Sequence, residues 1–146
     1  MELFGKTLQE YILPIKFYVI CSVLIVISQY AIALPLSDKY PFLLKLTQGI
    51  WMLMVALSAI KLILKYGDFG MKNVIALGVM YSIIIHGLKV SIRYVFYGKD
   101  LPYMIDRLAY GSFLVMAVAI FVGAVFIWAR KEGMLKGMGA EFLRRV

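Results

Sequence analysis

Four long apolar runs, separated by short polar segments, set the pattern of this chain. Residues 17–34 and 108–129 carry no charge, residues 46–60 are bounded by Lys45 and Lys61, and another apolar run starts near Val74. A helix rises about 1.5 Å per residue, so about 20 apolar residues cross a hydrocarbon layer of about 30 Å. The pattern predicts four transmembrane helices, at about 16–35, 43–65, 73–96 and 107–129.

The polar segments between these runs have the composition of turns. "YGDFGMKN" (66–73) and "GKDLP" (98–102) combine glycine or proline with aspartate, and Pro35 follows the first run. The predicted fold is therefore all-α: a polytopic membrane protein whose residues 1–146 form a single four-transmembrane-helix bundle. Short amphipathic segments are expected at both ends, the N-terminal one stopping at Pro14 and the C-terminal one (131–146) lying on the membrane surface.

Composition supports the membrane class. Hydrophobic residues make up 63% of the chain, and the mean hydropathy is +0.88, well above the values of ordinary soluble domains. The net charge of +8 is interpreted as flanking charge at bilayer surfaces, so nucleic acid is not an expected partner. A cleaved signal peptide, suggested by "AIA" at 31–33, is disfavoured because Glu2 and Glu10 interrupt its basic region.

The distribution of basic residues predicts the orientation. Four spans place both termini and the middle connection on one side, which carries ten basic residues against six on the other. The ten are Lys6, Lys16, Lys61, Lys65, Lys72, Arg130, Lys131, Lys136, Arg144 and Arg145. Basic residues concentrate in cytoplasmic loops. We therefore expect a multi-pass protein of the cell membrane with both termini in the cytoplasm.

The third run contains the only histidine of the chain together with a lysine and an arginine. At about 100° per residue, one helix face collects Gly78, Ser82, His86, Lys89, Arg93 and Tyr97. Gly78 and Ser82 form a small-residue step that lets another helix approach, and Ala119 with Gly123 offers a matching step on the fourth helix. This face is expected to point into the bundle or toward a partner.

Two interpretations of this face stay open at the level of sequence. In one, Lys89 and Arg93 are interfacial anchors, Asp100 and Asp106 pair with Arg93 or Lys99 in the outer loop, and His86 is a hydrogen-bonded packing residue. In the other, the face lines an outward-facing cavity that binds an anion or an anionic lipid headgroup. The ligand-binding residues of that site would be Ser82, His86, Lys89, Arg93 and Tyr97.

Other chemistry is not expected. All eight acidic residues lie outside the apolar runs, which disfavours a proton-coupled cation carrier. A single histidine and a single cysteine, Cys21, leave no paired haem ligands and no cysteine-based metal site within one chain. A hydrolase built on Ser82 and His86 lacks a carboxylate at that depth. The expected protein is not an enzyme and holds no cofactor or metal.

Two classes of function follow from these observations. The first is a small binding or accessory protein that contacts membrane lipids, takes an anionic ligand and forms a homo-oligomer. The alternative is a structural subunit of a larger membrane complex.

Two stretches carry a family resemblance. They are "LILKYGDFGMKNVIALGV" (62–79) and "LPYMIDRLAYGSFLVMAVAIF" (101–121), with Lys65–Tyr66 entering a turn, Phe69 within it, a basic residue late in the third span and Asp106 opening the last. Over about residues 55–128 the chain resembles the phosphate-starvation-inducible E (PsiE-like) family of small four-span proteins. The resemblance implies a four-helix bundle whose biochemical role is poorly defined.

Overall fold

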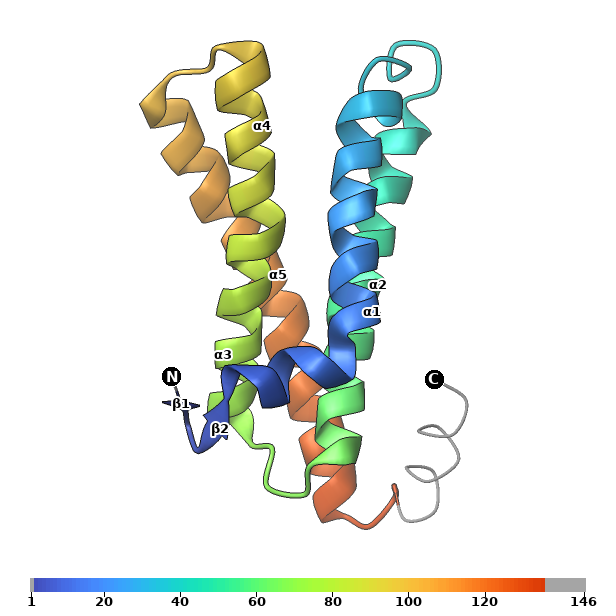
Figure 1. The fold of residues 1–146 in the computed structure, drawn as a ribbon. Helices are drawn as coiled ribbons and strands as arrows, with labels where there is room; N and C mark the ends of the chain where they lie inside the picture. The colour runs from blue at the N-terminus through green and yellow to red at the C-terminus, as the bar shows by residue number, and fades with distance from the viewer. Residues whose placement is uncertain (1, 136–146) are drawn as a thin grey trace.

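The structure, a computed structural model, describes residues 2–135. In chain order the elements are β1 (Glu2–Leu3), β2 (Lys6–Thr7), α1 (Leu8–Ser28), the π-helical turn η1 (Gln29–Ala33), α2 (Phe42–Lys65), α3 (Met71–Ser82), the π-helical turn η2 (Ile83–Gly87), α4 (Leu88–Tyr97) and α5 (Leu101–Lys131). Helix α1 runs on into η1, and α3, η2 and α4 follow one another without a break (Figure 1).

The four predicted spans are confirmed. Four helical stretches are long and apolar enough to cross a membrane: Leu8–Ala33, Phe42–Lys65, Met71–Tyr97 and Leu101–Lys131. The chain is therefore a multi-pass membrane protein with an all-α four-helix bundle. The first and last helices extend further than predicted, to Leu8 and Leu101, because Thr7 and Asp100 cap them by accepting from the amides of Glu10 and Tyr103.

The N-terminal segment differs from the prediction. Residues 2–7 form a short antiparallel hairpin, β1–β2, and the helix that follows passes through Pro14 instead of stopping there. Figure 1 shows the first turns of α1 lying across the bundle before the helix turns along it. Proline removes one backbone donor and bends a helix without ending it when tertiary contacts hold both halves. Of the predicted C-terminal amphipathic segment, residues 136–146 lie outside the described part of the chain.

One end of the bundle, which we call the closed end, consists of the hairpin, the α2–α3 turn and the last turns of α5. The buried Lys6 ammonium lies 2.9 Å from both carboxylate oxygens of Asp68 in that turn. The same ammonium holds the pKa of the Asp68 carboxyl below its usual value. Asn73, at the start of α3, donates to the Phe4 carbonyl and to the Tyr11 hydroxyl. These bonds tie the hairpin to the α2–α3 turn.

Arg130 ties α5 to the same turn. Its guanidinium donates to three backbone carbonyls, those of Ile63 at 3.0 Å, Tyr66 at 2.9 Å and Phe69 at 2.9 Å. These carbonyls belong to the last turn of α2 and to the turn after it, where the helix itself supplies no amide partners. The Tyr66 carbonyl also accepts from the Phe69 amide. The closed end thus joins α5 to the end of α2 and to the turn that leads into α3.

Helix α3 packs on α5 through glycines. A Cβ atom at Gly78 would lie 2.6 Å from Met116 Sδ and 3.4 Å from Ala119 Cβ, and one at Gly123 would lie 2.6 Å from Val74 Cγ1. The predicted close approach of the third and fourth helices is therefore confirmed at Gly78, Ala119 and Gly123, and the described contacts do not include Ser82. Close backbone approach of this kind is how helices associate where lipid removes the hydrophobic driving force.

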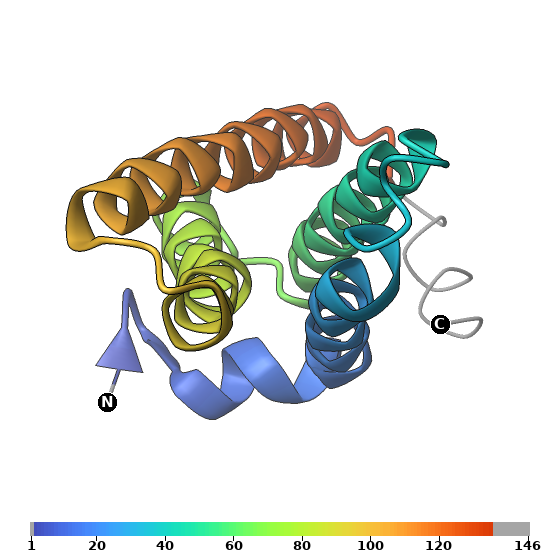
Figure 2. The same ribbon diagram turned by 90° about the horizontal axis from the view of Figure 1, so that it is seen from above.

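The opposite end, which we call the open end, consists of the α1–α2 connection (34–41) and the α4–α5 connection (98–100). In Figure 1 the pair α1 and α2 leans away from α4 and the first turns of α5 at this end, and Figure 2 shows the helices arranged in a ring when seen from above. His86, Lys89 and Arg93 of the third span lie in the half of the bundle nearer this end.

We predict that Gly123→Ala lowers the free energy of unfolding by about 1–3 kcal/mol, since the new methyl group collides with the β-branched Val74. The matched control is Gly49→Ala in α2, where a Cβ atom would meet nothing within 4 Å. That change should leave stability equal or slightly higher, because alanine favours a helix over glycine. Unfolding in mixed micelles measures both; equal effects would contradict the packing described here.

Candidate functional site

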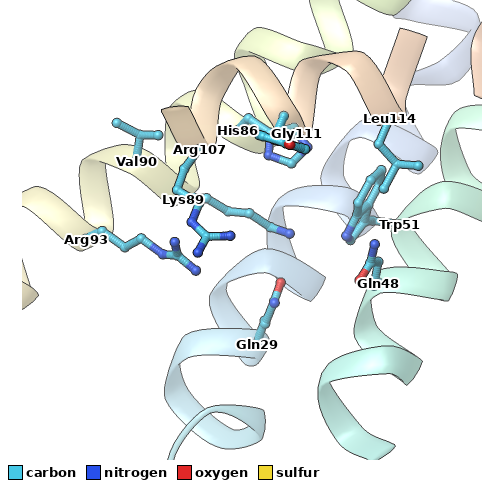
Figure 3. Close-up of a pocket in the computed structure, with 11 residues that line it drawn as sticks. Gln29, Gln48, Trp51, His86, Lys89, Val90, Arg93, Arg107, Gly111 and Leu114 are labelled. Carbon is cyan, nitrogen blue, oxygen red and sulfur yellow. The ribbon is translucent and has the colours of Figure 1, made fainter. Parts of the chain in front are cut away.

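A pocket of about 300 Å³ lies between all four helical stretches in the half of the bundle nearer the open end (Figure 3). We call it the basic pocket. Its lining residues are Gln29, Gln48, Trp51, His86, Lys89, Val90, Arg93, Arg107, Tyr110, Gly111 and Leu114. η1 supplies Gln29, α2 supplies Gln48 and Trp51, η2 and α4 supply the residues from His86 to Arg93, and α5 supplies the rest.

The pocket is strongly positive. Lys89, Arg93 and Arg107 line it, and Figure 3 shows their charged groups directed into the same space. None of the acidic residues in the described part of the chain lines it. Within a membrane a charged side chain is costly unless it is paired or reaches water. Three cations without a carboxylate therefore make this the place in the described bundle best suited to an anion.

Lys89 and His86 both contact the indole ring of Trp51. The Lys89 ammonium lies 4.9 Å from the centre of the indole ring, and the imidazole meets that ring edge-on with centroids 5.5 Å apart. The cation over the ring face is a stabilising cation–π contact. Trp51 is 1% exposed and His86 is 7% exposed, so both rings are held in place by packing.

Gly111 on α5 makes room for His86. A Cβ atom at this position would collide with the imidazole ring, with Nδ1, Cε1 and Cγ its nearest neighbours. The imidazole therefore lies directly against the α5 backbone. The π-helical turn η2, which contains His86, is the kind of irregularity that often marks a functional site.

Several polar atoms around the pocket are buried without a partner. Gln29 Oε1, Trp51 Nε1 and His86 Nε2 have no hydrogen-bond partner among residues 2–135, so the hydrogen bond expected of His86 as a packing residue is absent at Nε2. Each such atom costs free energy, so the pocket is not optimised for the empty protein. The three atoms include an acceptor, a donor and an imidazole nitrogen that can act as either, and all three belong to residues that line the pocket.

Arg93 is fixed by two tyrosines. Its Nε donates to the Tyr30 hydroxyl at 2.7 Å, and its Nη1 donates to the Tyr103 hydroxyl at 2.6 Å. The predicted pairing of Asp100 or Asp106 with Arg93 or Lys99 is wrong, since neither aspartate forms an ion pair within residues 2–135. Asp100 is the N-cap of α5, and Asp106 is exposed. Nη2 carries no hydrogen bond to the described residues and stays available to a ligand.

Three of the five predicted site residues lie together, namely His86, Lys89 and Arg93. Ser82 is buried outside the pocket and its Oγ has no partner within the described structure. Tyr97 faces away and packs on Tyr30 with ring centroids 6.1 Å apart. A step of four residues turns a side chain by about 40°, so Tyr97 lies about 80° around the helix from Lys89. Ser82 precedes the π-helical turn η2, whereas His86, Lys89 and Arg93 lie within or after it, so the regular α-helical spacing between Ser82 and these residues is interrupted.

The pattern of the third span did not predict the pocket residues that come from other helices. Gln29, Gln48, Trp51 and Arg107 come from three elements outside the third span. Only polar residues inside an apolar run, such as Gln29 and Gln48, gave a signal that could have been followed.

Comparison of the chain with protein-family models, with curated proteins and with solved structures found no match. The resemblance to the PsiE-like family stays a prediction.

We predict that Arg93→Lys lowers the free energy of unfolding by about 1–3 kcal/mol, because an ammonium group lacks the planar fork that reaches two hydroxyls at once. Arg107→Lys is the matched control, since Arg107 donates no hydrogen bond to the described residues and is exposed. Unfolding of the empty protein in mixed micelles measures both. If the Arg93→Lys variant is as stable as the parent protein, the tyrosine contacts do not fix Arg93, and it is an interfacial anchor that lysine can replace.

Proposed function

We propose that this protein is a small membrane-embedded binding protein, not an enzyme, which takes an anionic group into the basic pocket. The observation that carries the proposal is the meeting of three cations and three unpartnered buried polar atoms in one pocket that no described carboxylate lines. Charges and polar atoms left unpaired in a folded protein are commonly those that a ligand completes.

Phosphate and carboxylate groups fit the arrangement best. Arginine offers several donors in a fixed fork, lysine offers a point charge, and together they suit oxygen anions with more than one acceptor. Lys89 is the central residue of the pocket because its ammonium extends between Gln29 and Trp51 in Figure 3. Arg93 and Arg107 lie nearer the α4–α5 connection, where an anion would first meet them.

The side of the membrane follows from the orientation. With both termini in the cytoplasm, as the basic residues of the connections favour, the open end and the basic pocket face away from the cytoplasm. We therefore propose that the anion enters from the external side of the cell membrane.

Lys89→Met should weaken anion binding at least about tenfold, the effect of removing one charged contact. Trp51 is a built-in reporter: in a Trp128→Phe background it is the only tryptophan left of the two in the chain. Titration with glycerol 3-phosphate should then change its emission saturably. The empty Lys89→Met protein should be as stable as the parent or more so, since a costly charge has gone.

The matched control is Lys45→Met, at an exposed position near the start of α2 that does not line the pocket. It should bind glycerol 3-phosphate like the parent protein. Equal affinity in Lys89→Met and Lys45→Met, with a raised melting temperature in the former, would show that Lys89 is only an anchor and would refute the proposed site.

The orientation is tested by cysteine labelling in a Cys21→Ala background. Asp38→Cys, in the α1–α2 connection, should react with a membrane-impermeant maleimide in intact cells, whereas Gly67→Cys, in the α2–α3 turn, should react only after permeabilisation. Gly67 is chosen because its Cβ atom would meet nothing within 4 Å, while the neighbouring Asp68 is bonded to Lys6. The reverse labelling pattern would place the pocket on the cytoplasmic side.

A further inference from the structure

A second cavity lies beside the basic pocket, between the end of α1 with η1 and the helix α4. We call it the apolar groove. It has a volume of about 450 Å³, and its lining residues are Ile27, Tyr30, Ala31, Leu88, Ile92, Phe96 and Tyr97. Apart from the two tyrosines, these side chains are wholly apolar, and the groove lies along stretches that are apolar enough to span the membrane.

The two cavities lie on either side of the line along which η1 faces α4, which we call the seam. On η1, Gln29 lines the basic pocket and the next residue, Tyr30, lines the apolar groove; on α4, Lys89 lines the pocket and Leu88 the groove. The hydrogen bond from Arg93 Nε to the Tyr30 hydroxyl crosses this seam. Arg93 therefore links the basic pocket to the apolar groove. Its Nη2 has no hydrogen-bond partner in residues 2–135.

We infer that the ligand is one anionic phospholipid, whose phosphate lies among Lys89, Arg93 and Arg107 and one of whose acyl chains lies in the apolar groove. This inference rests on the proposed anion-binding function and names the class of its ligand. Charge complementarity selects an anionic headgroup, and the shared seam selects a molecule in which an anion and a chain are covalently joined.

The two cavities have different roles in this binding. Lipid tails surround the bundle in any case, so burying a chain in the groove gains no hydrophobic free energy over the bilayer. The groove contributes to affinity by packing closely around the chain, and the charges at the pocket select an anionic headgroup. The unpartnered acceptor Gln29 Oε1 favours a headgroup that carries a hydroxyl donor, such as the glycerol of phosphatidylglycerol.

The test separates the two cavities with variants that fill or block only one of them. Ala31→Phe fills the apolar groove, and Ala117→Phe is its matched control, since Ala117 on α5 is also exposed and lines neither cavity. The probes are palmitoyl-oleoyl phosphatidylglycerol, the corresponding phosphatidylcholine, and glycerol 3-phosphate as the headgroup without chains. Native mass spectrometry from detergent measures lipid binding, and Trp51 fluorescence measures glycerol 3-phosphate.

The parent protein should bind phosphatidylglycerol at least about tenfold more tightly than phosphatidylcholine. Ala31→Phe should lose about tenfold or more in affinity for phosphatidylglycerol and keep its affinity for glycerol 3-phosphate, whereas Ala117→Phe should keep both. Retained glycerol 3-phosphate binding also shows that Ala31→Phe is folded. Ile92→Asn, which places a polar group in the groove from α4, should repeat the result.

Two outcomes overturn different claims. If both groove variants bind phosphatidylglycerol like the parent while Lys89→Met loses glycerol 3-phosphate, the lipid inference is wrong and the anion site stands. If glycerol 3-phosphate binds equally well to Lys89→Met, the proposed function itself is wrong.

Discussion

Three glycines on α3 and α5 set the distance on which the rest of the bundle depends. Gly78 and Gly123 let the two helices approach until a methyl group at either position would collide with Met116 or Val74. Gly111 continues the same contact toward the open end, where the imidazole of His86 takes the space of the missing side chain. Since His86 and Lys89 lie on the same helical stretch, this backbone approach also decides where the basic pocket lies.

The two ends of the bundle meet the demands of a membrane in opposite ways. At the closed end Arg130 donates to three backbone carbonyls and Lys6 pairs with Asp68. Both charges therefore stabilise the α2–α3 turn. At the open end, within residues 2–135, Lys89 contacts only the face of Trp51 as a partner for its charge, and Arg107 only the ring of Tyr103, 5.2 Å away. Basic side chains therefore stabilise the fold at the closed end, whereas at the open end Lys89 and Arg107 are available to a ligand.

The open end carries a cost that the closed end does not. Cations that no described carboxylate pairs with, and the atoms of Gln29, Trp51 and His86 that have no partner among residues 2–135, lower the stability of the empty protein. The tyrosines around Arg93 limit that cost, because they hold one guanidinium in place while leaving Nη2 open. A stability gain on removing Lys89 and a loss on altering Arg93 are two consequences of this single arrangement.

The sequence by itself determined the class, the four spans and the helix face that carries His86, Lys89 and Arg93, because hydropathy and helical periodicity are local properties. It also indicated the glycine steps that bring α3 onto α5. Only the tertiary structure decided that Gln29, Trp51 and Arg107 complete the pocket, that Arg93 bonds to Tyr30 and Tyr103 instead of a carboxylate, and that Tyr97 faces the apolar groove. The reason is physical: helix bends, π-helical turns and the choice between competing partners depend on contacts between segments more than 50 residues apart, such as Arg93 with Tyr30, and no single-helix pattern contains them.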